Sequence, residues 1–191
     1  SSTDGLVDRY FNRPVGRLFS RLLIHTPVSP NLVSVVATFI GLSSCWFFAQ
    51  GSYDQMILGA LVLQFSAVID CVDGDLARVL FKESKAGKWI DLCGDQVVHV
   101  GLFASLALGL HWADSPAPEL WLGLSAVVGV ALAFAVVLRG MLRPEQRSNR
   151  RLQTLIDRTT NRDFSVLVLL LSIANRLDIF LWLTDSDVHI L

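Results

Sequence analysis

Long apolar segments alternate with short polar ones along most of this chain of 191 residues. Residues 32–49 carry no charge, and residues 55–69 are apolar before they run into an acidic stretch. A third apolar stretch extends from near Lys88 through Trp112, and a fourth covers about 120–138. A helix needs roughly 20 mainly apolar residues to cross a bilayer, so these segments predict transmembrane helices.

Two further apolar segments near the end of the sequence are shorter. Residues 164–174 and 177–184 predict a fifth and a sixth span, and both fall below the roughly 20 residues that a bilayer requires. The last span is therefore expected to be incomplete. The pattern predicts an all-α integral membrane protein with a bundle of six transmembrane helices, formed by one domain over residues 1–191.

The segment 5–24 has a different pattern, in which apolar residues recur at helical spacing. Arginines recur every four residues on another face, at positions 9, 13, 17 and 21. This is typical of a basic amphipathic helix that lies on the membrane surface. Pro14 predicts a kink or a break within it.

Composition supports a membrane protein. The chain is 52% hydrophobic and 17% charged, whereas soluble domains usually carry roughly 25% charged residues. The net charge of -1 gives no general attraction to nucleic acid, and no nucleic-acid partner is expected. Cys45, Cys71 and Cys93 lack the spacing of metal ligands and are interpreted as small core residues.

Basic residues are unevenly distributed between the polar connections. They are concentrated in the N-terminal helix, in residues 79–88 and in residues 139–162, while the loops 50–54 and 113–119 have none. The positive-inside rule places the basic side in the cytoplasm. The sequence thus predicts a multi-pass membrane protein whose candidate active site, at the aspartate-bearing helix ends, faces the cytoplasm.

Four aspartates at the ends of apolar helices are the strongest candidates for chemistry. Asp70 and Asp73 share one face of the second span, and Asp91 and Asp95 share one face of the third. An antiparallel pairing of these helices would bring the two acidic faces together. Four neighbouring carboxylates repel one another, and hard divalent cations relieve that repulsion. We therefore expect Mg²⁺ or Mn²⁺ at this place, as two ions in a site suited to phosphoryl chemistry.

Ion pairing is the alternative for these aspartates, with Arg78, Lys85 and Lys88 as partners. It fits a single aspartate better than four at fixed spacing beside glycines. A cation transporter is the alternative function, in which the aspartates form the ion site. A transporter predicts acidic groups near the middle of the bilayer, whereas these lie at helix ends on the basic side.

The aspartates belong to a longer pattern. It reads Asp70-x-x-Asp73-Gly74-x-x-Ala77-Arg78, then eight residues, then Gly87-x-x-x-Asp91-x-x-x-Asp95. This resembles the signature of the CDP-alcohol phosphotransferase family at every fixed position. The segment Ser29-Pro30-Asn31-Leu32-Val33-Ser34 is similar to the one that opens the family's first span. Two further segments look most like the inositol-phosphate branch: Asp4-Gly5-x-x-Asp8-Arg9-Tyr10-x-Asn12-Arg13 and Asn161-Arg162-Asp163-Phe164.

The resemblance implies a six-helix fold, usually homodimeric, and a reaction at the membrane. A substituted phosphate passes from a CDP-alcohol donor to an acceptor alcohol, and CMP is released during phospholipid biosynthesis. The resemblance implies metal ligands at Asp70, Asp73, Asp91 and Asp95, with Asp95 also accepting the proton of the acceptor hydroxyl. It further implies a nucleotide site lined by Asn31, Ser34, Gly74, Arg78 and Ser84.

Further expectations concern side chains near this site and in the basic connection. A helix-interior serine often bonds its own backbone, so a structural role for Ser34 stays open beside the nucleotide role. Arg139 and Arg162, at span edges, are candidates for an acceptor phosphate. The other arginines of residues 139–162 are expected to face anionic membrane lipid. His99 is interpreted as a helix-packing residue.

Overall fold

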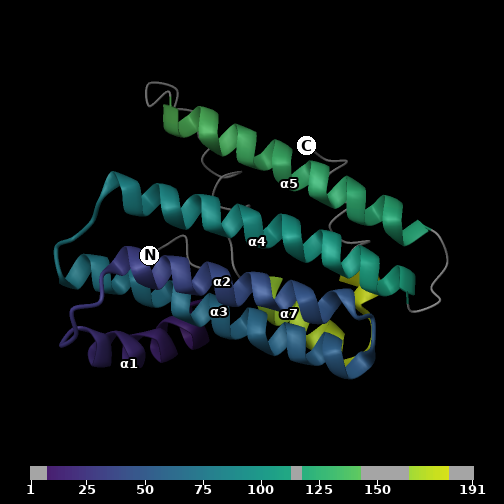
Figure 1. Ribbon diagram of the computed structural model, residues 1–191, viewed down its shortest axis with the longest axis horizontal. Helices are drawn as coiled ribbons and strands as arrows, with labels where there is room; N and C mark the ends of the chain where they lie inside the picture. The colour runs from purple at the N-terminus through teal and green to yellow at the C-terminus, as the bar shows by residue number, and fades with distance from the viewer. Residues whose placement is uncertain (1–7, 113–117, 143–163, 181–191) are drawn as a thin grey trace.

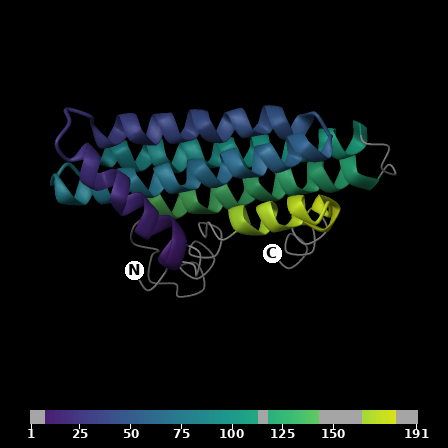
Figure 2. The same ribbon diagram turned by 90° about the horizontal axis from the view of Figure 1, so that it is seen from below.

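The computed structural model describes residues 8–112, 118–142 and 164–180, and every regular element in this part of the chain is helical (Figure 1). The elements are the π-helical turn η1 (Asp8–Asn12) and the α-helices α1 (Arg13–Leu23), α2 (Pro30–Ala49), α3 (Tyr53–Val79), α4 (Lys85–Trp112), α5 (Pro118–Leu142) and α7 (Phe164–Ile173). The long helices α2 to α5 run side by side as an elongated bundle (Figure 2).

Three of these helices, α2, α3 and α4, are long and apolar enough to cross a membrane. They confirm the first three predicted spans, with α4 beginning at Lys85 rather than near Lys88. Helix α5 encloses the predicted segment 120–138, and α7 has 10 residues. The predicted segment 177–184 extends outside the described residues. The all-α membrane fold is confirmed, and the count of six spans stays a prediction.

The bundle is apolar inside and outside. Its main core cluster joins side chains of α3, α4, α5 and α7, among them Leu63, Leu102, Leu106 and Val168. Large apolar side chains are also exposed along the outside of the bundle, for example Phe39, Leu61, Leu124 and Leu170. A helix that is apolar all round is stable in a bilayer, because lipid takes the place of water around it.

The turn from α1 into α2 has a clear chemical start signal. Ser29 is the N-cap, and its side chain accepts a hydrogen bond of 3.3 Å from the backbone N–H of Leu32. Pro30 occupies the first helical position, where its missing N–H costs nothing. Ser29, and not the nearby Asn31, therefore caps α2. This leaves Asn31 for another role.

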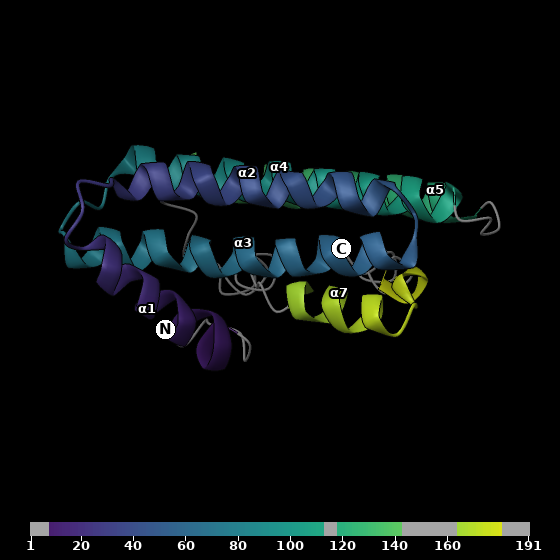
Figure 3. The same cartoon turned by 60° about the horizontal axis from the view of Figure 1, so that its bottom comes forward.

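Helix α1 packs along the outer side of α3 (Figure 3). Gly16 is buried there, and a Cβ added to it would lie 3.3 Å from the Cβ of Cys71. Asn12 is fully buried and accepts a hydrogen bond of 2.6 Å from Gln64 Nε2. The opposite face of α1 exposes Arg17, Leu18, Arg21 and Leu22. The exposed face thus carries leucines as well as arginines, and the basic amphipathic helix at the membrane surface stays a prediction.

Candidate active site

Helix α2 separates the two aspartate-bearing helices. It packs against both α3 and α4, whereas no Cα atom of α3 lies within 8 Å of a Cα atom of α4. Helices in direct contact usually have axes 8–10 Å apart, and their nearest Cα atoms then lie less than 8 Å from one another. The direct pairing of α3 with α4 expected from the sequence is thus wrong in detail. The wider spacing leaves room for side chains and a ligand between them.

Small residues on α4 allow α2 to approach closely. A Cβ added to Gly94 would lie 2.3 Å from Thr38 Oγ1, which is far inside van der Waals contact. The same relation recurs every seven residues, with Asn31 against Gly87, Thr38 against Gly94 and Cys45 against Gly101. These glycines of α4 therefore accommodate side chains of α2.

Gly74 of α3 is different from the α4 glycines. A Cβ added to Gly74 would meet no atom within 4 Å. Space is therefore left beside its backbone, which agrees with the place in a nucleotide site that the resemblance implies for Gly74. A glycine in a helix interior costs about 1 kcal/mol relative to alanine, and packing against a neighbouring helix does not account for it here.

The two kinds of glycine should respond oppositely to alanine. Gly94→Ala should lower the melting temperature, because its new methyl group overlaps Thr38, and adding Thr38→Ala should restore part of the loss. Gly74→Ala should leave the melting temperature unchanged or raised, since alanine favours the helix, but it should weaken binding of a CDP-alcohol. Thermal denaturation of the purified variants, with a binding measurement on each, checks both. Equal destabilisation by the two alanines would contradict the assignment of Gly94 to helix packing and of Gly74 to the ligand space.

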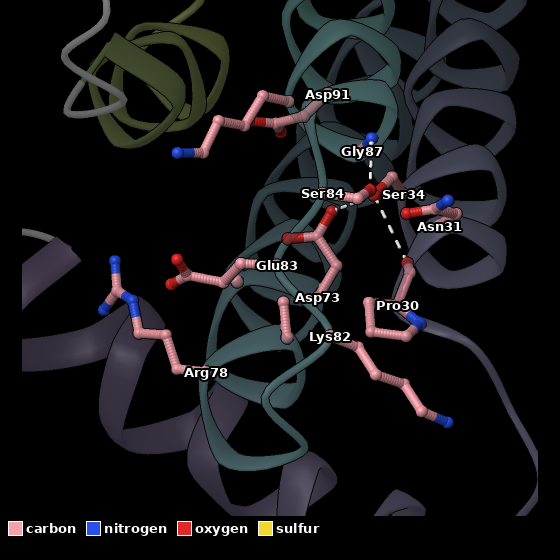
Figure 4. A pocket seen from close by; sticks show the side chains of 13 residues that line it. Pro30, Asn31, Ser34, Asp73, Arg78, Lys82, Glu83, Ser84, Gly87 and Asp91 are labelled. Carbon is pink, nitrogen blue, oxygen red and sulfur yellow. Dashed lines mark hydrogen bonds between the residues drawn. The ribbon is translucent and has the colours of Figure 1, made fainter.

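A cavity of about 200 Å³ opens between α2, the ends of α3 and α4, and their connection (Figure 4). We call it the outer cavity. Its lining includes all five residues expected to contact nucleotide: Asn31, Ser34, Gly74, Arg78 and Ser84. It also includes Pro30, Asp73, Ala77, Lys82, Glu83, Gly87, Lys88 and Asp91. The structure thus brings together residues from three separate stretches of sequence.

The charges of the outer cavity suit a phosphorylated ligand. Arg78, Lys82 and Lys88 line it, and such cations can bind phosphate oxygens, arginine with two parallel hydrogen bonds. Asp73 and Asp91 lie in the same lining and suit a metal ion. Lys82 and Lys88 were not among the residues expected from the sequence to contact nucleotide. The position of these lysines on either side of the start of α4 was the signal in the sequence that could have identified them.

Ser34 connects α2 to the acidic face of α3. Its hydroxyl donates a hydrogen bond to Asp73 Oδ2, and both side chains are buried (Figure 4). The same hydroxyl lies 3.3 Å from the carbonyl oxygen of Pro30. A hydroxyl has a single hydrogen, which these two acceptors must share. Ser34 therefore has both the backbone contact considered from the sequence and a contact to an aspartate.

Ser84 has a local structural role as well as a place in the outer cavity. Its Oγ accepts a hydrogen bond of 2.9 Å from the backbone N–H of Gly87. Ser84 directly precedes the first residue of α4, so this is the bond expected of a helix N-cap. The cap fixes the start of α4 beside the ligand space.

A second, smaller cavity lies nearer the middle of the bundle. This inner cavity has a volume of about 40 Å³, and its lining contains Asp70, Asp95 and His99 together with the hydroxyl-bearing Thr38, Ser66 and Ser165. His99 Nδ1 lies 2.6 Å from the backbone carbonyl oxygen of Asp95. A carbonyl oxygen can only accept, so Nδ1 carries the proton of this bond. This local bond fits a packing residue, as expected.

The four aspartates divide between the cavities. Asp73 and Asp91 line the outer one, and Asp70 and Asp95 line the inner one. One carboxylate oxygen from each of Asp70, Asp91 and Asp95 lies within 4.8 Å of the others, and we call these the three-carboxylate cluster. Asp91 therefore belongs to the cluster and also borders the outer cavity.

The three-carboxylate cluster fits a hard divalent ion. Two oxygens on opposite sides of Mg²⁺ are roughly 4.2 Å apart at the usual bond length, so the observed spacing needs only a small adjustment. Asp73 is not a member of the cluster, and its Oδ2 accepts the bond from Ser34. Of the four ligands predicted from sequence, the structure groups three and sets Asp73 toward the outer cavity.

Of the two predicted acceptor residues, the structure describes only Arg139. Arg139 lies exposed in the last turn of α5, and neither cavity lining includes it. Arg162 lies outside the described residues. Their role stays a prediction.

Comparison with known proteins agrees with this site. The family model described as CDP-alcohol phosphatidyltransferase matches residues 27–184. The chain therefore belongs to the CDP-alcohol phosphatidyltransferase family. The match includes both cavities and all four aspartates.

Similar proteins carry the names of lipid and inositol-phosphate enzymes. The chain is 31% identical over 107 residues to the bifunctional IPC transferase and DIPP synthase of Aquifex aeolicus, covering 56% of this chain and 24% of that protein. It is 29% identical over 98 residues to the archaetidylinositol phosphate synthase of Pyrococcus horikoshii, covering 51% of this chain and 50% of that one. The chain thus spans between a quarter and a half of the length of these relatives.

A solved structure has the same fold. The crystal structure of Mycobacterium tuberculosis phosphatidylinositol phosphate synthase (PgsA1) with CDP-DAG bound matches with a TM-score of 0.61 at 19% identity. The match covers 93% of this chain and 90% of that one. The similarity confirms that the helices are arranged as in a membrane enzyme of this family.

Proposed function

We propose that the chain transfers a substituted phosphate from a CDP-alcohol to an acceptor alcohol and releases CMP, with a divalent metal ion as cofactor. One observation carries this proposal. The three-carboxylate cluster borders, through Asp91, a cavity whose other lining residues include the cations Arg78, Lys82 and Lys88. A diphosphate needs both metal and cationic donors around its oxygens. Nothing in the comparisons favours the cation transporter.

The residues divide the chemistry between them. Asp70, Asp91 and Asp95 would hold an ion, and Asp73 with Asp91 would face a second one. Bound metal would neutralise charge on the diphosphate and on the departing CMP. Arg78 and Lys82 orient the donor in the outer cavity. Asp95 accepts the proton of the acceptor hydroxyl while the hydroxyl oxygen attacks the β-phosphorus. The bond between that phosphorus and the CMP oxygen then breaks.

The relatives suggest which alcohols are joined. The archaetidylinositol phosphate synthase and the phosphatidylinositol phosphate synthase both name an inositol phosphate product. We infer that this chain also acts in inositol phospholipid synthesis, with a lipid or an inositol phosphate as one substrate. The N-terminal residues that resemble the inositol-phosphate branch support the inference only indirectly, because Asn12 is buried against Gln64 and lines neither the outer nor the inner cavity.

The membrane arrangement completes the proposal. The N-terminal helix lies on the membrane surface, six helices cross the bilayer, and the outer cavity opens to the cytoplasm, where soluble nucleotide is available. The bias of lysine and arginine toward one side supports this orientation. A homodimer is the expected assembly.

Release of CMP tests the function directly. The purified chain, in lipid nanodiscs with Mg²⁺, is given CDP-diacylglycerol or CDP-inositol together with inositol phosphate, glycerol phosphate or a lipid alcohol. CMP release that depends on both a donor and an acceptor is expected for at least one pair. Release of no CMP from any pair, by a chain that still binds CDP-alcohol, would refute the transfer reaction.

Acceptor binding can be separated from chemistry through Arg139 and Arg162. If either side chain binds an acceptor phosphate, its replacement by alanine should raise the KM for the acceptor far more than the KM for the donor. Steady-state kinetics with each substrate varied in turn measures this. Small, equal changes in both constants would assign these arginines to the lipid-facing surface.

A further inference from the structure

Phe81 has a backbone conformation that its side chain disfavours. Its φ is +52°, in the left-handed region, at the end of α3. The backbone N–H of Phe81 donates to the carbonyl oxygen of Arg78 (3.3 Å), and that of Lys82 donates to the carbonyl oxygen of Ala77 (2.9 Å). This is the Schellman pattern, whose left-handed position is usually occupied by glycine or sometimes by asparagine.

The end of α7 shows the same pattern with a suitable residue. Asn175 has a φ of +54°, and the N–H groups of Asn175 and Arg176 bond back to Ser172 and Leu171. Asparagine tolerates this conformation, whereas a bulky residue such as phenylalanine is strained in it. The fold therefore gains nothing from phenylalanine at position 81.

Packing and the outer cavity do not explain Phe81 either. Its side chain is 95% exposed. The next three residues, Lys82, Glu83 and Ser84, line the outer cavity, and Phe81 does not. A strained and exposed aromatic residue points to a contact outside the protein.

The position of Phe81 along the bundle indicates what that contact is. Helix α3 has 27 residues, or about 40 Å at 1.5 Å per residue, while a bilayer with its headgroups is about 40–45 Å thick. Exposed tryptophans at the opposite end of the bundle, Trp46, Trp112 and Trp121, are typical of the other interface. A bilayer that encloses α3 would therefore have its headgroups at the level of Phe81, two residues past the last residue of that helix.

Charge in the same connection suits a lipid surface. Lys82 and Lys85 are exposed on either side of Glu83, and Lys88 follows in the first turn of α4. Basic residues close to an apolar anchor bind anionic headgroups. We propose that Phe81 inserts into the headgroup layer and, with Lys85, which does not line the outer cavity, binds the α3–α4 connection to the membrane surface. The inserted ring thereby holds the Lys82–Ser84 wall of the outer cavity at the level of the lipid.

Depth measurement with a spin label tests the proposal. The three native cysteines are replaced by alanine, and Phe81→Cys carries a nitroxide in nanodiscs of phosphatidylcholine and phosphatidylglycerol. Glu83→Cys, two residues away and also exposed, is the matched control. We expect position 81 to be more accessible to oxygen, which enters lipid, and position 83 to a water-soluble nickel chelate. A label at 81 as open to the chelate as the label at 83 overturns the proposal.

Nucleotide binding distinguishes the remaining explanation, in which the ring stacks on a nucleobase. Phe81→Gly relieves the left-handed strain and should raise the melting temperature by about 2–4 °C, which shows that the variant folds. Its dissociation constant for CMP in detergent should be unchanged. Weaker CMP binding by Phe81→Gly would mean that the ring serves the nucleotide instead. Both experiments give an answer even if the transfer reaction is not observed.

Discussion

Asp95→Asn is expected to abolish turnover while the chain still binds its CDP-alcohol. Asparagine preserves the shape of the side chain but cannot accept a proton from the acceptor hydroxyl. General-base contributions are about 10²–10⁴-fold in rate, and loss of one carboxylate from the three-carboxylate cluster adds to this. The donor should remain bound because Asp95 lines the inner cavity and the donor residues line the outer one. CMP release and CDP-alcohol binding are measured at saturating Mg²⁺.

Asp73→Asn provides the matched control, since it makes the same chemical change in the same group of aspartates. Asp73 lines the outer cavity and receives the hydrogen bond of Ser34. Its replacement should weaken CDP-alcohol binding, because a neutral amide is a poorer ligand for a hard cation. Saturating donor should then recover more activity in Asp73→Asn than in Asp95→Asn.

The pair of variants gives a clear decision. Near-normal turnover by Asp95→Asn would end its assignment as the general base. Equal loss of donor binding in both variants would instead make Asp95 chiefly a metal ligand. Either result would move the proton acceptor to another group near the cluster.

The sequence predicted the helical fold and most of the candidate site because both depend on short-range patterns. Apolar segments of sufficient length specify α2, α3 and α4 almost independently of their neighbours. The spacing of Asp70 with Asp73, and of Asp91 with Asp95, fixes which side chains share a helix face. The short connection between α3 and α4 then brings the two faces to one end of the bundle.

The arrangement of helices around the site was harder to predict. Nothing in the motif indicates that α2 separates α3 from α4, because that depends on how Thr38 fits against Gly94. The division of the aspartates between two cavities follows from the position of α2 between α3 and α4. The hydrogen bond from Ser34 to Asp73, which joins residues 39 positions apart in the chain, follows from it as well. Such contacts are set by tertiary packing and leave no local trace in the sequence.

Removal of divalent metal is the second change expected to have a very large effect. Excess EDTA should reduce CMP release to background, and Mg²⁺ or Mn²⁺ added back should restore it. The physical reason is the three-carboxylate cluster, whose like charges repel one another unless a cation lies between them. Full turnover in excess EDTA would show that the cluster has another purpose.

Asp91→Asn makes the metal prediction specific to a residue. Asp91 belongs to the cluster and also lines the outer cavity, so its loss should weaken metal binding and donor binding together. Replacement of a residue that is hydrogen-bonded to a metal ligand typically lowers the affinity for the metal by about 10–100-fold. Loss of a charged ligand itself should raise the Mg²⁺ concentration needed for activity at least as much. Asp54→Asn is the control, because Asp54 is exposed in the first turn of α3, at the end of the bundle opposite to the three-carboxylate cluster. Titration of activity with Mg²⁺ compares the two variants. An unchanged Mg²⁺ requirement in Asp91→Asn would remove Asp91 from the metal site.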